Sequence, residues 1–159
     1  MNKQELYIHI GTVKTGTSAI QRFLDANRNA LQKRGIVYPI NKDHFAHHRL
    51  SWSLRTKIRP KLWNWPEDLG TPEEEWEYVL GQLTGSCGLI SSEDLFWCPP
   101  GLVAETKKLT SKFNVKLIVY WRRRDLLADS WYNELVKTGG LVTLPSYRKK
   151  LTSKSDFDE

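Results

Sequence analysis

The chain has 159 residues, a formal net charge of +6 and 40% hydrophobic residues. A chain of this length forms one domain and buries roughly two thirds of its unfolded surface, which excludes a peptide that needs disulfides or metals in order to fold. The apolar content excludes an intrinsically disordered chain, and no apolar run reaches the roughly 18 residues of a membrane-spanning helix. The excess of basic residues suits an anionic ligand and, equally, an ordinary soluble surface.

The N-terminal residues show neither an apolar signal region nor a small-residue cleavage site, so we expect a cytoplasmic protein. Cys87 and Cys98 lack CxxC spacing and are expected to be free thiols.

The first elements form a strand, a loop and a helix. Residues 6–10 are rich in β-forming side chains and end at a glycine-rich loop, residues 11–18. Apolar residues at helical spacing then predict a helix over residues 17–33, which Gly35 ends.

The rest of the chain repeats this alternation. Residues 40–70 show no sustained period and leave room for one short helix, whereas Thr71, Pro72 and Glu74 together mark the start of a helix. The predicted elements after residue 34 are strand 35–39, helix 72–83, strand 88–91, helix 99–112, a buried strand 115–121 and helix 125–137.

Strands that alternate with helices predict an α/β fold, a three-layer sandwich in which helices flank a short parallel sheet. Ligands of such sheets bind at the carboxyl ends of the strands.

The loop after the first strand has the composition of a phosphate-binding loop. Gly11 and Gly16 keep the GxxxxG spacing of nucleoside-triphosphate P-loops, and backbone N–H groups and the start of the following helix favour an anion there. In that motif Lys follows the second glycine, whereas here Lys14 lies inside the loop. The displaced lysine argues against simple ATP hydrolysis.

Residues 9–18, HIGTVKTGTS, resemble the 5′-phosphosulfate loop of the sulfotransferase family, with its Lys-Thr-Gly-Thr-Ser core. Residues 119–125 and 130–132 resemble the 3′-phosphate segment of that family, in which an Arg ends a strand and a Ser follows eight residues later, as Arg122 and Ser130 do. The resemblance implies a P-loop-like fold and a donor site made of Gly11, Thr12, Lys14, Thr15, Gly16, Thr17, Ser18, Arg122 and Ser130.

The resemblance further implies 3′-phosphoadenosine 5′-phosphosulfate (PAPS) as the co-substrate, with no metal. Lys14 would neutralise the charge that develops on the leaving phosphate. Glu93, directly after a predicted strand, occupies one common position of the general base in that family. A surface or helix-capping carboxylate is an equal alternative for Glu93.

Histidines compete with Glu93 for the role of the base. His44, His47 and His48 lie within five residues, and His47 or His48 is a candidate residue on the acceptor side. A metal site would need more ligands than the nearby Asp43 provides. Polar loop residues at the surface are an equally good interpretation.

Trp52, Trp63 and Trp65 lie among basic residues, but no nucleic-acid recognition motif accompanies them, so packing of the long segment is favoured over ligand stacking. The expected partner is therefore a small-molecule, glycan or lipid acceptor, without nucleic acid. Neither the acceptor nor the oligomeric state is encoded in a recognisable pattern.

Two rival functions stay open: a P-loop nucleotide kinase or phosphotransferase, and a truncated, non-catalytic relative that binds nucleotide. The second arises because the family continues past the 3′-phosphate helix into a Lys- and Gly-rich loop that residues 138–159 lack. The resemblance thus implies a single sulfotransferase-like domain, residues 1–159, incomplete at its C-terminal end.

Overall fold

The structure is a computed structural model that describes residues 3–42, 45–56, 65–85, 87–140 and 142–147. Asp43, His44 and Trp63, which the sequence analysis considered, lie outside the described residues. The chain divides into two compact units, Met1–Tyr120 and Trp121–Glu159, and each is described here by itself. That residues 1–159 form a single domain stays a prediction.

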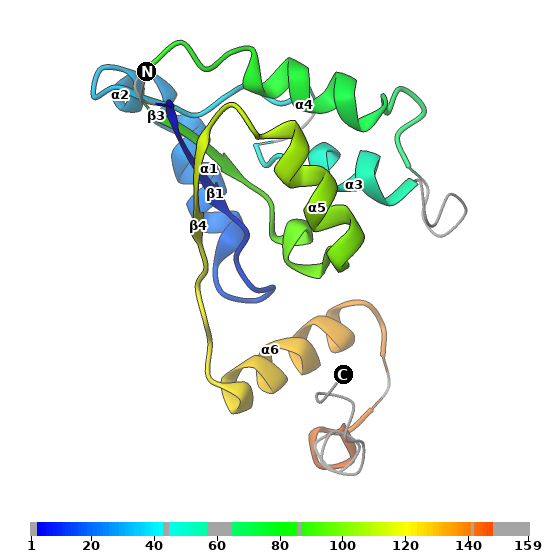
Figure 1. The fold of residues 1–159 in the computed structure, drawn as a ribbon. Helices are drawn as coiled ribbons and strands as arrows, with labels where there is room; N and C mark the ends of the chain where they lie inside the picture. Colours follow the sequence, from blue (N-terminus) through cyan, green and yellow to red (C-terminus); the bar gives the residue numbers. More distant parts are fainter. Residues whose placement is uncertain (1–2, 43–44, 57–64, 86, 141, 148–159) are drawn as a thin grey trace. The chain divides into compact units, whose positions relative to one another are not determined.

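The first unit alternates strands and helices, as the sequence predicts (Figure 1). No helix in the described ranges combines the length and the apolar character needed to cross a membrane. The elements of the first unit are β1 (Glu5–His9), α1 (Thr17–Ala26), α2 (Arg28–Gln32), β2 (Ile36–Val37), α3 (His48–Thr56), α4 (Pro72–Leu80), β3 (Cys87–Ser91), the 3-10 helix η1 (Glu93–Trp97), α5 (Pro100–Leu109) and β4 (Asn114–Ile118), and the second unit contains α6 (Arg124–Lys137).

The four strands form one parallel sheet in the order β2-β3-β1-β4, which confirms the α/β prediction. His9 at the end of β1 pairs in register with Ser91 on one side and Ile118 on the other. Helices α1 and α2 lie across the strands from α3, α4 and α5 (Figure 1), an arrangement compatible with a three-layer sandwich.

The strand order creates a reversal of direction between β1 and β3. From β1 the chain crosses β3 to reach β2, whereas from β3 it crosses β1 to reach β4. Adjacent strands whose connections leave in opposite directions open a crevice at their carboxyl ends, where α/β proteins bind ligands. The candidate site is therefore expected after His9 and Ser91.

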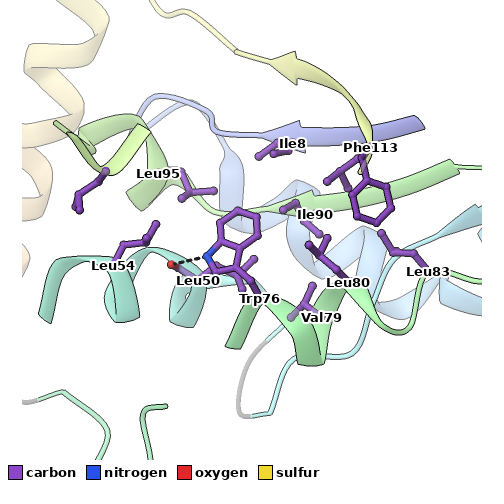
Figure 2. Close-up of a cluster of buried hydrophobic side chains, with 12 residues drawn as sticks. Ile8, Leu50, Leu54, Trp76, Val79, Leu80, Leu83, Ile90, Leu95 and Phe113 are labelled. Carbon is purple, nitrogen blue, oxygen red and sulfur yellow. Dashed lines mark hydrogen bonds between the residues drawn. The ribbon is translucent and has the colours of Figure 1, made fainter. Parts of the chain in front are cut away.

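One face of the sheet packs against α3, α4 and α5 and forms the core shown in Figure 2. Leu6 and Ile8 of β1 alternate toward this face, together with Ile90 of β3. The indole Nε1 of Trp76 donates to the carbonyl of Leu50 at 3.2 Å, so the largest core side chain also leaves no buried donor unpaired. The alternation directs His9 to the opposite face.

Two of the predicted elements differ from the structure in more than their bounds. The helix expected over residues 17–33 breaks at Asn27, whose side-chain amide donates to the carbonyl of Phe23 at 2.7 Å and so competes with the backbone ladder. The strand predicted over residues 115–121 is present as β4, but it ends at Ile118 and is not buried, because it is the edge of the sheet. Leu117 is 62% exposed there, since β4 pairs only with β1 among the described strands.

The start of α4 confirms the capping prediction. The hydroxyl of Thr71 accepts from the backbone N–H of Glu74, and the Glu74 carboxylate accepts in return from the backbone N–H of Thr71. Pro72 occupies the first helical position. The helix ends at Leu80, slightly before the predicted end.

A fully buried ion pair joins α3 to α4. The Arg49 guanidinium donates from Nε and Nη2 to the two carboxylate oxygens of Glu75, at 3.0 and 2.9 Å. Burial by itself would raise the pKa of Glu75, but the hydrogen bonds from Arg49, from the backbone N–H of Gly70 and from Lys42 outweigh it and lower this pKa to about 2. The ionised carboxylate is thus favoured in the folded chain.

We expect Glu75→Gln to lower the free energy of unfolding at neutral pH by about 1–3 kcal/mol, because Arg49 and Lys42 would lose a buried carboxylate, while Arg49 would keep its ion pair with Asp68. The parent should also lose stability as the pH falls from the ordinary Glu value of 4.5 to about 2, since Glu75 is protonated more readily when unfolded. Denaturant titrations between pH 2 and pH 7 measure both effects.

The control is Glu77→Gln, at an exposed position of the same helix. Equal stability of the two variants at neutral pH, or the same acid dependence in Glu75→Gln as in the parent, would contradict this account of the ion pair.

Candidate functional site

The loop between β1 and α1 has an unusual backbone. Gly11, Lys14 and Gly16 have φ angles of 35°, 65° and 86°, in the left-handed region that favours glycine. Lys14 is the one described non-glycine residue in that region. Backbone that alternates between left- and right-handed conformations turns successive N–H groups toward one point and so forms a concave anion site.

The base of this loop is hydrogen-bonded to both neighbouring strand ends. The N–H of Ile10 donates to the carbonyl of Ile118 at 3.0 Å, and the N–H of Thr12 donates to the carbonyl of Tyr120 at 3.3 Å. On the other side, the N–H of Ser92 donates to the carbonyl of His9 at 3.0 Å. The start of the loop is therefore held in the reversal between β1 and β3.

Helix α1 begins directly after Gly16 with no side-chain cap and no acidic residue in its first turn. The N–H groups at a helix start carry a partial positive charge, which attracts anions and is usually offset by such residues. The absence of both leaves this end of α1 electrostatically suited to phosphate or sulfate.

The four hydroxyl side chains of the loop differ in their surroundings. The Oγ1 of Thr12 donates to the carbonyl of Tyr120 at 3.1 Å, and the Oγ1 of Thr15 donates to the carbonyl of Thr12. Thr17 is buried against Gly11, whereas Ser18 is exposed. Thr12 and Thr15, which the sequence suggests as ligand contacts, also maintain the shape of the loop.

His9, which the sequence analysis did not select, lies beneath the loop. Its ring is 2% exposed, and Nδ1 lies 2.7 Å from the Ser91 hydroxyl. The Nε2 atom is buried and has no hydrogen-bond partner among the described residues. Burial lowers the pKa of His9, although the charge of Glu93 opposes this, so burial favours the neutral ring.

The structure brings Glu93 and His48 together, although they are 45 positions apart in the chain. Glu93 Oε2 lies 3.9 Å from His48 Nε2. On its other side His48 Nδ1 lies 3.0 Å from the Ser92 hydroxyl and 3.4 Å from Asp94 Oδ2. The two residues proposed as alternative bases are thus neighbours at the carboxyl end of β3.

Side chains of α1, α3 and η1 hold the Glu93–His48 pair in place. The Nε2 of Gln21 donates to Glu93 Oε2 at 2.6 Å, and the indole of Trp52 donates to Asp94 Oδ2 at 2.8 Å. The Trp52 ring also stacks on His48, with 5.6 Å between centroids. A base oriented by a carboxylate on its far side is the arrangement found in many acid–base sites.

The sequence offered weak signals for these partners. Gln21 follows Thr17 by one helical turn, and Asp94 is next to Glu93, but the contacts depend on how α1, α3 and η1 meet. Trp52 contacts His48 and Asp94, and its role in packing rather than ligand stacking stays a prediction.

His47 is part of the core and not of this cluster. Its ring is fully buried, with Nδ1 accepting from the backbone N–H of Ser91 at 3.2 Å and Nε2 3.1 Å from the carbonyl of Pro39. Burial lowers the pKa of His47 to about 4. With both ring nitrogens engaged, His47 joins the chain after β2 to the end of β3, which leaves His48 as the candidate base of these two histidines.

Arg122 and Ser130 belong to the second unit. Arg122 is partly buried just before α6, and Ser130 is partly buried within that helix. Arg123 is paired instead with Asp125, which agrees with the interpretation of Arg123 as a surface residue.

No protein-family model, curated protein or solved structure matched this chain. Among the described residues, no three His, Cys, Asp or Glu side chains form a group that would hold a metal ion.

The loop conformation makes a specific prediction for Gly11. A Cβ at this position would lie 2.5 Å from Thr17 Cγ2 and 3.2 Å from His9 Nε2, on a backbone with positive φ. We therefore expect Gly11→Ala to lower the free energy of unfolding by about 1–3 kcal/mol, the usual cost of overpacking. Denaturant unfolding measures this difference.

The matched control is Gly101→Ala in α5, where a Cβ meets nothing within 4 Å. This substitution should leave stability unchanged or raise it by up to about 1 kcal/mol. Equal stability of Gly11→Ala and the parent would show that the loop does not need its left-handed conformation.

Proposed function

We propose that this chain is a PAPS-dependent sulfotransferase-like protein with a P-loop-like, three-layer architecture. It transfers a sulfuryl group to a hydroxyl or amine of a small-molecule, glycan or lipid acceptor in the cytoplasm. The observation that carries the proposal is the left-handed loop with Lys14, which follows β1 and opens α1, while the neighbouring strand β3 ends next to the Glu93–His48 pair.

The loop supplies the donor half of the site. Gly11, Gly16 and the first N–H groups of α1 would surround the 5′-phosphosulfate, and Lys14 would place its charge on the oxygen that bridges phosphorus and sulfur. This oxygen gains negative charge as the sulfur–oxygen bond breaks, so a cation there stabilises the transition state more than the ground state. A lysine inside the loop fits this role better than transfer of a γ-phosphate.

The Glu93–His48 pair supplies the acceptor half. The acceptor oxygen or nitrogen forms a bond to sulfur, the bond from sulfur to the bridging oxygen breaks, and the acceptor proton passes to Glu93. His48 is the alternative base, because Asp94 and Ser92 fix the orientation of its ring. The leaving group is 3′-phosphoadenosine 5′-phosphate (PAP).

A nucleotide kinase is the second candidate, since it shares a strand-loop-helix unit and a parallel sheet. Kinases place a lysine after the second glycine and hold Mg²⁺ with nearby oxygen ligands. Thr17 stands at the lysine position here. The two functions therefore differ in their expected nucleotide and metal requirement.

Calorimetry with PAP, without metal, and with ATP plus Mg²⁺ tests the proposal directly. We expect PAP to bind the parent, and Lys14→Asn to weaken binding by about 1.5–3 kcal/mol, the contribution of a hydrogen bond to a charged group. Asn tolerates the left-handed backbone of position 14, so the loop keeps its shape.

Lys33→Asn, at an exposed position after α2, is the control and should bind PAP like the parent. Binding of ATP with Mg²⁺ and no binding of PAP would favour the kinase. Equal PAP affinity in Lys14→Asn and the parent would remove the loop from the donor site.

Arg122 makes a separate prediction about the 3′-phosphate. If Arg122 holds this group, Arg122→Ala should weaken the binding of PAP by about 1.5–3 kcal/mol. The binding of AMP, which has no 3′-phosphate, should not change. Arg123→Ala is the matched control, because the Arg123 guanidinium is paired with Asp125. Equal losses for PAP and AMP in Arg122→Ala would count against the assignment.

A further inference from the structure

Gln21 is a polar residue in a fully buried position. Its side chain lies in the second turn of α1 and is 0% exposed. The Nε2 atom donates to Glu93 Oε2 at 2.6 Å, whereas Oε1 is buried without a partner among the described residues. Burying an amide with an unsatisfied acceptor costs free energy that an apolar side chain would avoid. The bond to Glu93 is therefore the feature that distinguishes glutamine here.

Glu93 is surrounded by side chains from four segments. Among the described residues, Glu93 contacts Gln21 of α1 and His48 of α3. Its Oε2 atom makes both contacts. The charge of Glu93 also acts on His9 of β1 and on Tyr38 after β2, and Asp94 follows it in η1. Gln21 is the neighbour that donates a short hydrogen bond to the carboxylate.

We propose that Gln21 is a positioning residue for Glu93, orienting the carboxylate to take the acceptor proton. This inference rests on the proposed function, in which Glu93 is the base. An N–H that bonds to a carboxylate favours its ionised form, and the asymmetric contact at Oε2 fixes the plane of the group.

The position of Gln21 gives this contact a second consequence. The helix that carries Gln21 starts at the donor loop, and Gln21 lies four residues after Thr17, about 6 Å along the helix axis. A helix is stiff over one turn, so α1 fixes the spacing between the donor phosphosulfate and the base. A single element thus positions both reacting groups, as in-line transfer requires.

The test is a ¹³C NMR titration of the Glu93 carboxyl group in the parent and in Gln21→Met, which has similar volume but no donor. We expect the pKa of Glu93 to rise by about 1–2 pH units in Gln21→Met, equivalent to the loss of a charge-assisted hydrogen bond. Gln21→Glu should raise it further, because two carboxyl groups at hydrogen-bond distance share one proton. Gln32→Met, at an exposed position of α2, is the control.

The second readout is the pH dependence of PAP release from PAPS with a hydroxyl acceptor. In Gln21→Met the acid limb of kcat/KM should move to higher pH by the same amount, with the affinity for PAP unchanged. A residue with a purely structural role would lower stability and leave both quantities as in the parent.

An unchanged Glu93 pKa in Gln21→Met would overturn the inference, and should that variant not fold, Gln21→Glu is judged by the same criterion. The titration needs no activity. A parent that fails to bind PAP would thus refute the proposed function, while the NMR result still decides whether Gln21 controls Glu93.

Discussion

The register between β1 and β3 is the constraint on which the site depends. It places His9 level with Ser91, so that the loop after β1 and the segment Ser92–Asp94 after β3 leave the sheet at the same edge. Because the connections from these strands run in opposite directions, the two segments lie where α/β proteins commonly bind ligands. Shifting β1 by one residue relative to β3 would turn His9 toward the core face.

Buried polar contacts then fix the segments around this edge of the sheet. The Arg49–Glu75 pair joins α3 to α4 one residue after His48, and His47 joins the preceding segment to the backbone of Ser91. Both contacts are satisfied and lie outside the proposed chemistry. Of the four buried polar side-chain atoms without a partner among the described residues, His9 Nε2 and Gln21 Oε1 lie at the site, and the other two are Asn41 Oδ1 and Trp65 Nε1. Native proteins tend to keep such costly groups where function needs them.

Local sequence signals predicted much of the fold, because caps, glycines and periodicity act over a few residues. Thr71 and Glu74 predicted the start of α4, and the loop of residues 11–18 was located correctly between a strand and a helix. The edge position of β4 was missed, since a run of apolar residues is equally typical of a central strand. The Gln21–Glu93 contact was also beyond sequence reasoning, because it depends on how elements far apart in the chain pack together.

The central claim is that the left-handed loop and the start of α1 bind the phosphosulfate end of a donor. Backbone amide NMR with PAP as the titrant tests it most directly. The account predicts that the largest shift changes occur at Lys14, Gly16, Thr17 and Ser18, and that Lys14→Asn reduces them at equal PAP concentration. Saturating PAP without any change at these amides would contradict it.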